Sequence, residues 1–214
     1  MGRISRIYNW AKREKNLYTL LGFWFLFLQV IVFIENHYVY KYNIFFWFCD
    51  HAPLLFSFAF FSKNKDFIKA MVNFGFLVQF VWVIDLVFKL FFDVHALRVI
   101  GYMFENELGF FVLVPLAIHM LSTNIAFLST YKRKPNAKVL IYSAMYVMII
   151  FALTITYTPI DRNVNCVHEI CGLRQYTFPS YTYFWPILVF SLMVLPTHGI
   201  QYLIYKYSKR KRRN

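Results

Sequence analysis

Four ionisable side chains and one thiol lie inside apolar stretches of the sequence, where their chemistry would be unusual. They are Cys49, Asp50, His51, Asp85 and His119. A cysteine and a histidine can act together, because an imidazole that takes the thiol proton leaves a more reactive thiolate. A buried carboxyl can orient a histidine or carry a proton. The residue types therefore point to thiol chemistry, to proton transfer, or to polar contacts between helices.

Helical spacing gives two of these residues polar neighbours. Ser122 and Thr123 follow His119 by three and four positions, and Lys89 follows Asp85 by four. Side chains at these spacings share one face of a helix, so Asp85 and Lys89 are predicted to pair. The structural alternatives are helix–helix hydrogen bonds for His119 and a neutralised carboxyl for Asp85.

The composition indicates a membrane protein. Of 214 residues, 59% are hydrophobic and only 15% are charged, whereas a soluble domain carries about a quarter charged residues. Part of every fold faces its solvent, so this excess of apolar side chains is expected to face lipid. The net charge of +13 comes from basic residues that gather between apolar stretches. This placement indicates membrane orientation, and we expect no nucleic-acid partner.

Six windows are long and apolar enough to cross about 30 Å of hydrocarbon. They are Leu17–Ile34, Ile44–Phe61, Phe67–Phe92, Phe110–Thr130, Val139–Thr158 and Tyr181–Tyr205. We therefore predict an all-α, polytopic bundle of six transmembrane helices at residues 17–205. A basic segment at residues 1–16 precedes it, and a basic tail at residues 206–214 follows it.

The basic residues set the orientation, because loops rich in lysine and arginine stay in the cytoplasm. Four lie on one side of the predicted bundle: Lys41, Arg98, Arg162 and Arg174. The opposite side holds Arg3, Arg6, Lys12, Arg13, Lys15, Lys63, Lys65, Lys69, Lys132, Arg133, Lys134, Lys138, Lys206, Lys209, Arg210, Lys211, Arg212 and Arg213. Both termini are thus expected in the cytoplasm. The membrane would be the plasma membrane of a prokaryote or the endoplasmic reticulum of a eukaryote.

This orientation places the candidate residues at similar depths. At 1.5 Å per residue, Cys49, Asp50 and His51 would lie about 8–10 Å below the non-cytoplasmic surface. Asp85 would lie about 10 Å and His119 about 14 Å below the same surface. We therefore expect a common polar chamber in the outer half of the bilayer.

The longest outer loop contains Cys166 and Cys171. Two cysteines five positions apart on the non-cytoplasmic side are expected to form a disulfide. Free thiols, or a metal site with His168, are the alternatives. The spacing of Cys166, His168 and Cys171 matches no common zinc pattern, and we expect neither a metal nor a cofactor.

Three short stretches resemble a known family. These are Phe46-Trp47-Phe48-Cys49-Asp50, Pro115-Leu116-Ala117-Ile118-His119 and Phe184-Trp185-Pro186. They look like the YwaF and transmembrane protein 164 family, which is similar in turn to the androgen-induced protein family. The resemblance implies an intramembrane acyltransferase or hydrolase acting on lipid acyl esters, with Cys49 as nucleophile and His119 as base.

Three functional hypotheses follow. The first is this lipid acyltransferase or ester hydrolase, supported by Asp50, His51 and Asp85, with membrane lipids as its partners. The second is a small proton-coupled transporter, whose ion path would use Asp50, His51, Asp85 and His119. The third is a non-catalytic scaffold, in which the polar residues join helices. The sequence leaves a homo-oligomer open.

Overall fold

The computed structural model describes residues 3–40, 46–97, 99–105 and 113–211, with backbone alone for residues 3–12, 39, 40, 102 and 105. Within these ranges the chain forms helices and connecting turns, without a β-strand. The all-α class predicted from the sequence is therefore confirmed.

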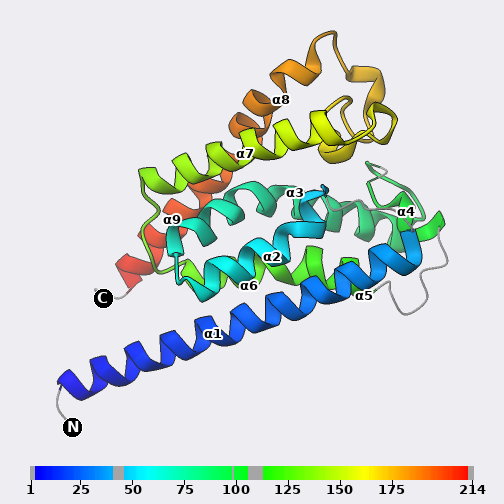
Figure 1. Ribbon diagram of the computed structural model, residues 1–214. Coiled ribbons are helices and arrows are strands. Elements are labelled where there is room, and N and C mark those ends of the chain that lie inside the picture. Colours follow the sequence, from blue (N-terminus) through cyan, green and yellow to red (C-terminus); the bar gives the residue numbers. More distant parts are fainter. Residues whose placement is uncertain (1–2, 41–45, 98, 106–112, 212–214) are drawn as a thin grey trace.

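Five helices in the described part of the chain are long and apolar enough to cross a membrane (Figure 1). Three of them include π-helical residues, because the first continues from α1 into the π-helical η1 (Asn36–Tyr40). The five are α1 (Arg3–Glu35); α3 (Lys65–Phe92); α5 (Leu113–Leu116), continued by the π-helical η3 (Ala117–Ser122) and α6 (Thr123–Thr130); α7 (Ala137–Tyr157); and α8 (Tyr181–Val189), continued by the π-helical η7 (Phe190–Val194) and α9 (Leu195–Lys211).

The sixth expected span corresponds to a shorter helix, α2 (Phe48–Phe61). Its 14 residues extend about 21 Å, less than the hydrocarbon thickness of about 30 Å. The expected window began at residue 44, and residues 44 and 45 lie outside the described part of the chain, as do residues 110–112 of the fourth window. The structure thus supports a multi-pass membrane bundle.

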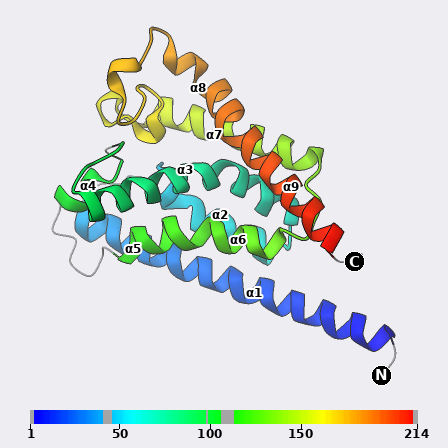
Figure 2. The ribbon, with the colours of Figure 1, turned by 180° about the vertical axis from the view of Figure 1, so that it is seen from behind.

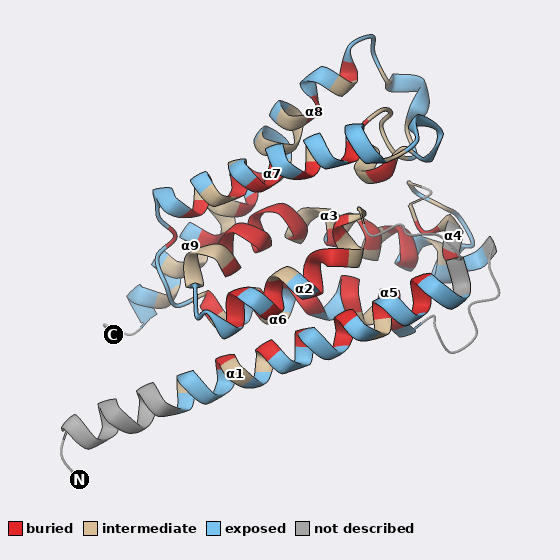
Figure 3. Ribbon diagram, viewed as in Figure 1, coloured by how far each residue is buried: buried red, intermediate tan, exposed pale blue. Residues whose placement is uncertain are grey.

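Helix α3 lies at the centre of the bundle and packs against α2, α6, α7 and α9 (Figures 1 and 2). Burial is concentrated along α3 and on the inward faces of its neighbours, whereas the outer faces of α1 and α7 are largely exposed (Figure 3). Large apolar side chains such as Phe23, Phe27 and Ile149 are on those exposed faces. An apolar exterior of this kind fits a lipid environment.

Several polar side chains are instead buried inside the bundle. They include Gln29, Lys69, Asn73, Gln79, Asp85, His119, Ser143 and Gln201. In an apolar interior such groups need hydrogen-bond partners, so their partners show how the bundle is held together.

The first helix begins, and the last helix ends, at the same end of the bundle (Figures 1 and 2). The turn from α2 to α3 and the loop from α6 to α7 lie there too. Asn64 and Asn136 begin the helices that follow, because their side chains accept hydrogen bonds from the free N–H groups of Phe67 and Val139. We call this the terminal end.

The opposite end, which we call the loop end, carries the longer connections. It contains the π-helical η1 (Asn36–Tyr40), the short helix α4 (Gly101–Glu105), and the 3₁₀ turns η4 (Ile160–Arg162), η5 (Val164–Cys166) and η6 (Arg174–Tyr176). The residues Lys41 and Arg98, which the sequence places on this side, lie outside the described part of the chain.

Candidate functional site

A cavity of about 130 Å³ lies between α3 and the helix formed by η3 and α6. We call it the α3–α6 pocket. It is lined by Phe76, Gln79, Phe80, Val83, His119, Met120, Thr123 and Asn124. Its volume exceeds that of a single water molecule, which is about 30 Å³. The pocket can therefore hold several waters or a small polar group.

Four polar atoms of the residues that line this pocket are buried without a hydrogen-bond partner in the described structure. They are Nε2 and Oε1 of Gln79, Nδ1 of His119 and Oγ1 of Thr123. A buried polar atom without a partner costs about 1–3 kcal/mol. Such atoms are exceptional in folded proteins. Of the eight in the described structure, these four belong to residues around one cavity, and the others are on His95, Ser122, His168 and Thr197.

His119 is held in place by ring stacking. Its imidazole lies 4.3 Å from the ring of Trp82, centre to centre, and the planes differ by 10°. His119 lies within the π-helical η3, whose wider turn changes which side chains face α3. Such π-helical turns are frequent at functional sites.

The α3–α6 pocket opens toward the lipid-facing surface. Phe80 is 56% exposed and Met120 is 44% exposed at its margin, and both lie within helices of membrane-spanning length. None of the lining residues carries a carboxyl, an ammonium or a guanidinium group. The pocket is therefore suited to an uncharged group that enters sideways from the bilayer.

Cys49 is not among the residues that line the α3–α6 pocket. Its sulfur hydrogen-bonds Oδ1 of Asp50 at 3.6 Å, and its side chain packs against Val32, Val114 and Ile118. In the described structure no hydrogen bond joins Cys49 to His119. The predicted nucleophile and its predicted base are thus not assembled. A neighbouring carboxyl would moreover oppose a thiolate rather than stabilise it.

Asp50 belongs to a polar group at the start of α2. The side chains of Asn36 and Glu35 approach its carboxyl. Its carbonyl oxygen accepts a hydrogen bond from Nε2 of Gln29 at 2.8 Å, and Oε1 of Gln29 accepts one from the backbone N–H of Leu54 at 2.8 Å. The Gln29 amide thereby replaces a helical hydrogen bond, in the turn that contains Pro53.

His51 and Asp85 take part in separate contacts. Nε2 of His51 lies 2.5 Å from the hydroxyl of Tyr146 on α7. His51 and Asp85 therefore bond to different partners, because residues at one depth can face different neighbours around their helices. The common polar chamber expected from similar depths stays a prediction.

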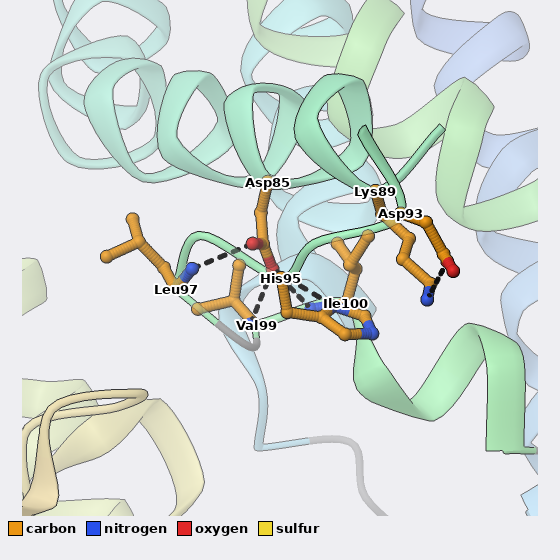
Figure 4. A network of polar contacts seen from close by, with 7 residues as sticks. All are labelled: Asp85, Lys89, Asp93, His95, Leu97, Val99 and Ile100. Atoms are coloured by element: carbon orange, nitrogen blue, oxygen red, sulfur yellow. Dashed lines mark hydrogen bonds and ion pairs between the residues drawn. The ribbon is translucent and has the colours of Figure 1, made fainter. Parts of the chain in front are cut away.

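Asp85 caps a loop instead of pairing with Lys89 (Figure 4). Its carboxyl, which is fully buried, accepts hydrogen bonds from the backbone N–H groups of Leu97, Val99 and Ile100 at 2.8, 2.8 and 3.2 Å. Lys89 reaches Asp93 at the end of α3, and its ammonium group holds the pKa of Asp93 below the ordinary value. The predicted Asp85–Lys89 pair is wrong, since the folded loop supplies three better donors.

The ring of His95 also approaches this carboxyl (Figure 4). Its Nδ1 lies 4.0 Å from Oδ2 of Asp85, beyond hydrogen-bond distance. Asp85 thus stabilises the connection after α3 and is not directed at His119.

Cys166 and Cys171 are joined by a disulfide. Both candidate thiol ligands are therefore bonded to each other, and the alternative metal site with His168 is not formed.

The loop containing this disulfide is anchored by Asn165. The Asn165 side chain accepts a hydrogen bond from the N–H of Phe48 at 2.9 Å and donates to the carbonyl of Phe46 at 2.7 Å and to Oγ1 of Thr154 at 3.1 Å.

A polar group in the terminal half of the bundle escaped the sequence analysis. Lys69 was counted among the loop lysines, but it is 1% exposed, and its ammonium donates to Oε1 of Gln201 at 3.0 Å. Nε2 of Gln201 donates to the carbonyl of Lys69 and to Oδ1 of Asn73. The sequence signal was a lysine and an asparagine four positions apart on one helix face.

Gln79 was also not predicted from the sequence, because glutamine does not ionise and does not stand out in an apolar window.

Comparisons of the chain with known protein families, with curated proteins and with solved structures find no match. The resemblance to the YwaF and transmembrane protein 164 family stays a prediction, and the function must be argued from the geometry.

Proposed function

We propose that this protein binds an uncharged membrane lipid, whose polar group enters the α3–α6 pocket from the bilayer. The observation that supports the proposal is the set of four unpaired buried atoms on Gln79, His119 and Thr123 around one cavity. A lipid that fills this cavity would remove a cost of about 1–3 kcal/mol for each atom it pairs.

The pocket offers both donors and acceptors, which defines the chemistry of the ligand. Nε2 of Gln79 and the hydroxyl of Thr123 can donate to a carbonyl oxygen, and Oε1 of Gln79 can accept from a hydroxyl. Nδ1 of His119 can do either, depending on its tautomer. The ligand therefore carries an ester or amide carbonyl and a free hydroxyl, as a diacylglycerol does. Its acyl chains would lie along Phe76, Phe80 and Met120.

The bundle in this proposal has six spans, with α2 as the shortest, and both termini in the cytoplasm. The support is the concentration of basic residues at the terminal end and the position of both termini there. The loop end would then face the periplasm or the lumen of an organelle, which suits a disulfide.

The geometry favours binding over acyl transfer. Covalent catalysis needs a nucleophile within hydrogen-bond reach of its base, and Cys49 contacts Asp50 and not His119. The polar group around Asp50 does not supply a base for Cys49, because its members contact one another and Gln29. Acyl transfer by Cys49 would require a rearrangement of α2 or η3.

The experiment is a thermal unfolding measurement on the purified full-length chain in neutral detergent, with dioctanoylglycerol as the probe. A ligand at one hundred times its Kd stabilises the folded state by about 2.7 kcal/mol. For a chain of this size the expected rise in Tm is about 5–10 °C. Trioctanoylglycerol, which lacks the free hydroxyl, should give a much smaller rise.

Two variants make the measurement specific. Gln79→Leu removes two of the pocket's polar atoms and should abolish the rise in Tm caused by dioctanoylglycerol. Gln175→Leu makes the same chemical change in an exposed loop residue and should leave the rise unchanged. An equal rise in the wild type and in Gln79→Leu, or an equal rise with both lipids, would refute the proposal.

A further inference from the structure

The outward face of α9 combines basic and apolar side chains near the end of the helix. Lys206, Tyr207 and Arg210 follow Leu203 by three, four and seven positions, so the four residues share one face of the helix. Together with Lys209 they line a shallow surface hollow of about 430 Å³. All five side chains are exposed, and we call this surface the α9 basic hollow.

The charges of the α9 basic hollow are not neutralised. Among the described residues, no ion pair involves Lys206, Lys209 or Arg210. Other cations at the terminal end do have an acidic partner, since Glu14 contacts both Lys65 and Arg133. Three positive charges within five residues thus remain available to an anion.

The apolar part of the hollow indicates where that anion comes from. Leu203 is 64% exposed and Tyr207 is 71% exposed, on a helix that continues directly from a membrane-spanning segment. Tyrosines commonly mark the boundary between hydrocarbon and headgroups. The cations therefore lie at headgroup level, with an apolar surface directly below them for acyl chains.

We propose that the α9 basic hollow binds the phosphate group of one anionic phospholipid, with its acyl chains against Leu203. This site is separate from the α3–α6 pocket and takes a lipid of the opposite character, charged rather than neutral. Lysine and arginine donate directly to phosphate oxygens, and the guanidinium of Arg210 can bind two of them at once. Each basic side chain near an anionic membrane surface strengthens binding roughly five-fold.

The test uses native mass spectrometry of the purified full-length chain in neutral detergent. The probes are dihexanoyl phosphatidylglycerol, dihexanoyl phosphatidylcholine and inorganic phosphate. We expect one phosphatidylglycerol bound per chain at low concentration, and far less phosphatidylcholine. The triple variant Lys206→Gln, Lys209→Gln, Arg210→Gln should weaken phosphatidylglycerol binding about 100-fold, the product of three roughly five-fold contributions.

The control is a triple variant with the same loss of charge at the same end of the bundle: Lys132→Gln, Lys134→Gln, Lys138→Gln. All three of these lysines are exposed, and their replacement should leave binding within about two-fold, since additivity errors between distant sites are small. If both triple variants lose affinity equally, the attraction is a general effect of net charge and the proposed site is wrong.

Two further outcomes would overturn the proposal. Equal binding of phosphatidylcholine would show that negative charge is not recognised, and tight binding of inorganic phosphate alone would show that the ligand is not a lipid. If the triple variant fails to fold, the single variants Lys206→Gln and Arg210→Gln replace it, each with an expected loss of about five-fold.

Discussion

Two buried glutamines show how differently the same side chain can be used inside this bundle. Gln201 is fully hydrogen-bonded, because its Oε1 accepts from Lys69 and its Nε2 donates to the Lys69 carbonyl and to Asn73. Gln79 is equally buried, but both of its polar atoms lack partners in the described structure. The first glutamine joins α9 to α3, whereas the second is the residue that we propose binds a ligand.

This difference predicts opposite effects of one substitution. Gln201→Leu should lower the free energy of unfolding by about 2–4 kcal/mol, because it leaves the buried Lys69 ammonium and Oδ1 of Asn73 without the partners they have in Gln201. Gln79→Leu should raise it by about 1–2 kcal/mol in lipid-free detergent, because two unpaired atoms disappear. Thermal or denaturant unfolding of both variants in the same detergent measures the difference. Destabilisation by Gln79→Leu would mean that Gln79 joins helices.

At the scale of the elements, α2 is the helix whose position depends most on its neighbours. It begins beside the Cys49–Asp50 contact and contains Pro53, and the amide of Gln29 takes the place of one of its backbone hydrogen bonds. Its first N–H group is capped from another part of the chain, by Asn165 of the disulfide-containing loop. The disulfide-containing loop therefore fixes the start of α2.

Asn165 can be tested as the anchor of that loop. Asn165→Ala should lower the free energy of unfolding by about 2–3 kcal/mol, since it removes the cap of α2 and leaves the Phe46 carbonyl unpaired. Its backbone has a φ of 54°, which asparagine tolerates better than alanine. Thermal unfolding of the oxidised chain provides the measurement.

Two comparison variants separate the cap from the other contacts of Asn165. Asn165→Asp keeps the oxygen that accepts from Phe48 and should lose less stability. Gln175→Ala removes an exposed amide that is not part of the α3–α6 pocket, and it should change little. An equal loss in Asn165→Ala and Gln175→Ala would contradict an anchoring role.

Sequence reasoning located the helices well and their contacts poorly. Apolar length predicted α3 and α7 to within two residues of their ends, because the cost of exposing backbone to lipid fixes where a span begins and ends. Depth along a helix also follows from residue number. The direction in which a side chain points around the bundle depends on tertiary packing. This is why Cys49 was expected to pair with His119, whereas in the described structure its sulfur hydrogen-bonds Asp50.

Tertiary packing also explains why the roles of other residues were not predicted from the sequence. Lys69 looked like a loop lysine because its partner, Gln201, is 132 positions away. Asp85 looked like the partner of Lys89 because the competing donors lie in the loop beyond α3. Non-ionisable residues such as Gln79 and Asn165 carry no charge that would attract attention in an apolar sequence. Each of these roles is set by a contact that no local pattern encodes.

The whole molecule is a bundle with an apolar exterior and a polar interior that is largely hydrogen-bonded. Of the eight buried polar atoms without a partner in the described residues, four belong to residues that line the α3–α6 pocket. This pocket opens toward lipid through Phe80 and Met120. The anchored α2 and the Lys69–Gln201 contact stabilise the bundle on either side of α3. The central claim is that a lipid polar group completes the bonds of the α3–α6 pocket.

The most direct test is photo-crosslinking of the full-length chain in membranes with a diacylglycerol that carries a diazirine close to its ester group. Mass spectrometry of the labelled peptides then locates the polar end of the lipid. We expect labelling concentrated at residues 76–83 and 119–124, with strong loss of labelling in Gln79→Leu and no loss in Gln175→Leu. Labelling spread evenly over the lipid-facing surfaces of α1 and α7, and unchanged in Gln79→Leu, would contradict it.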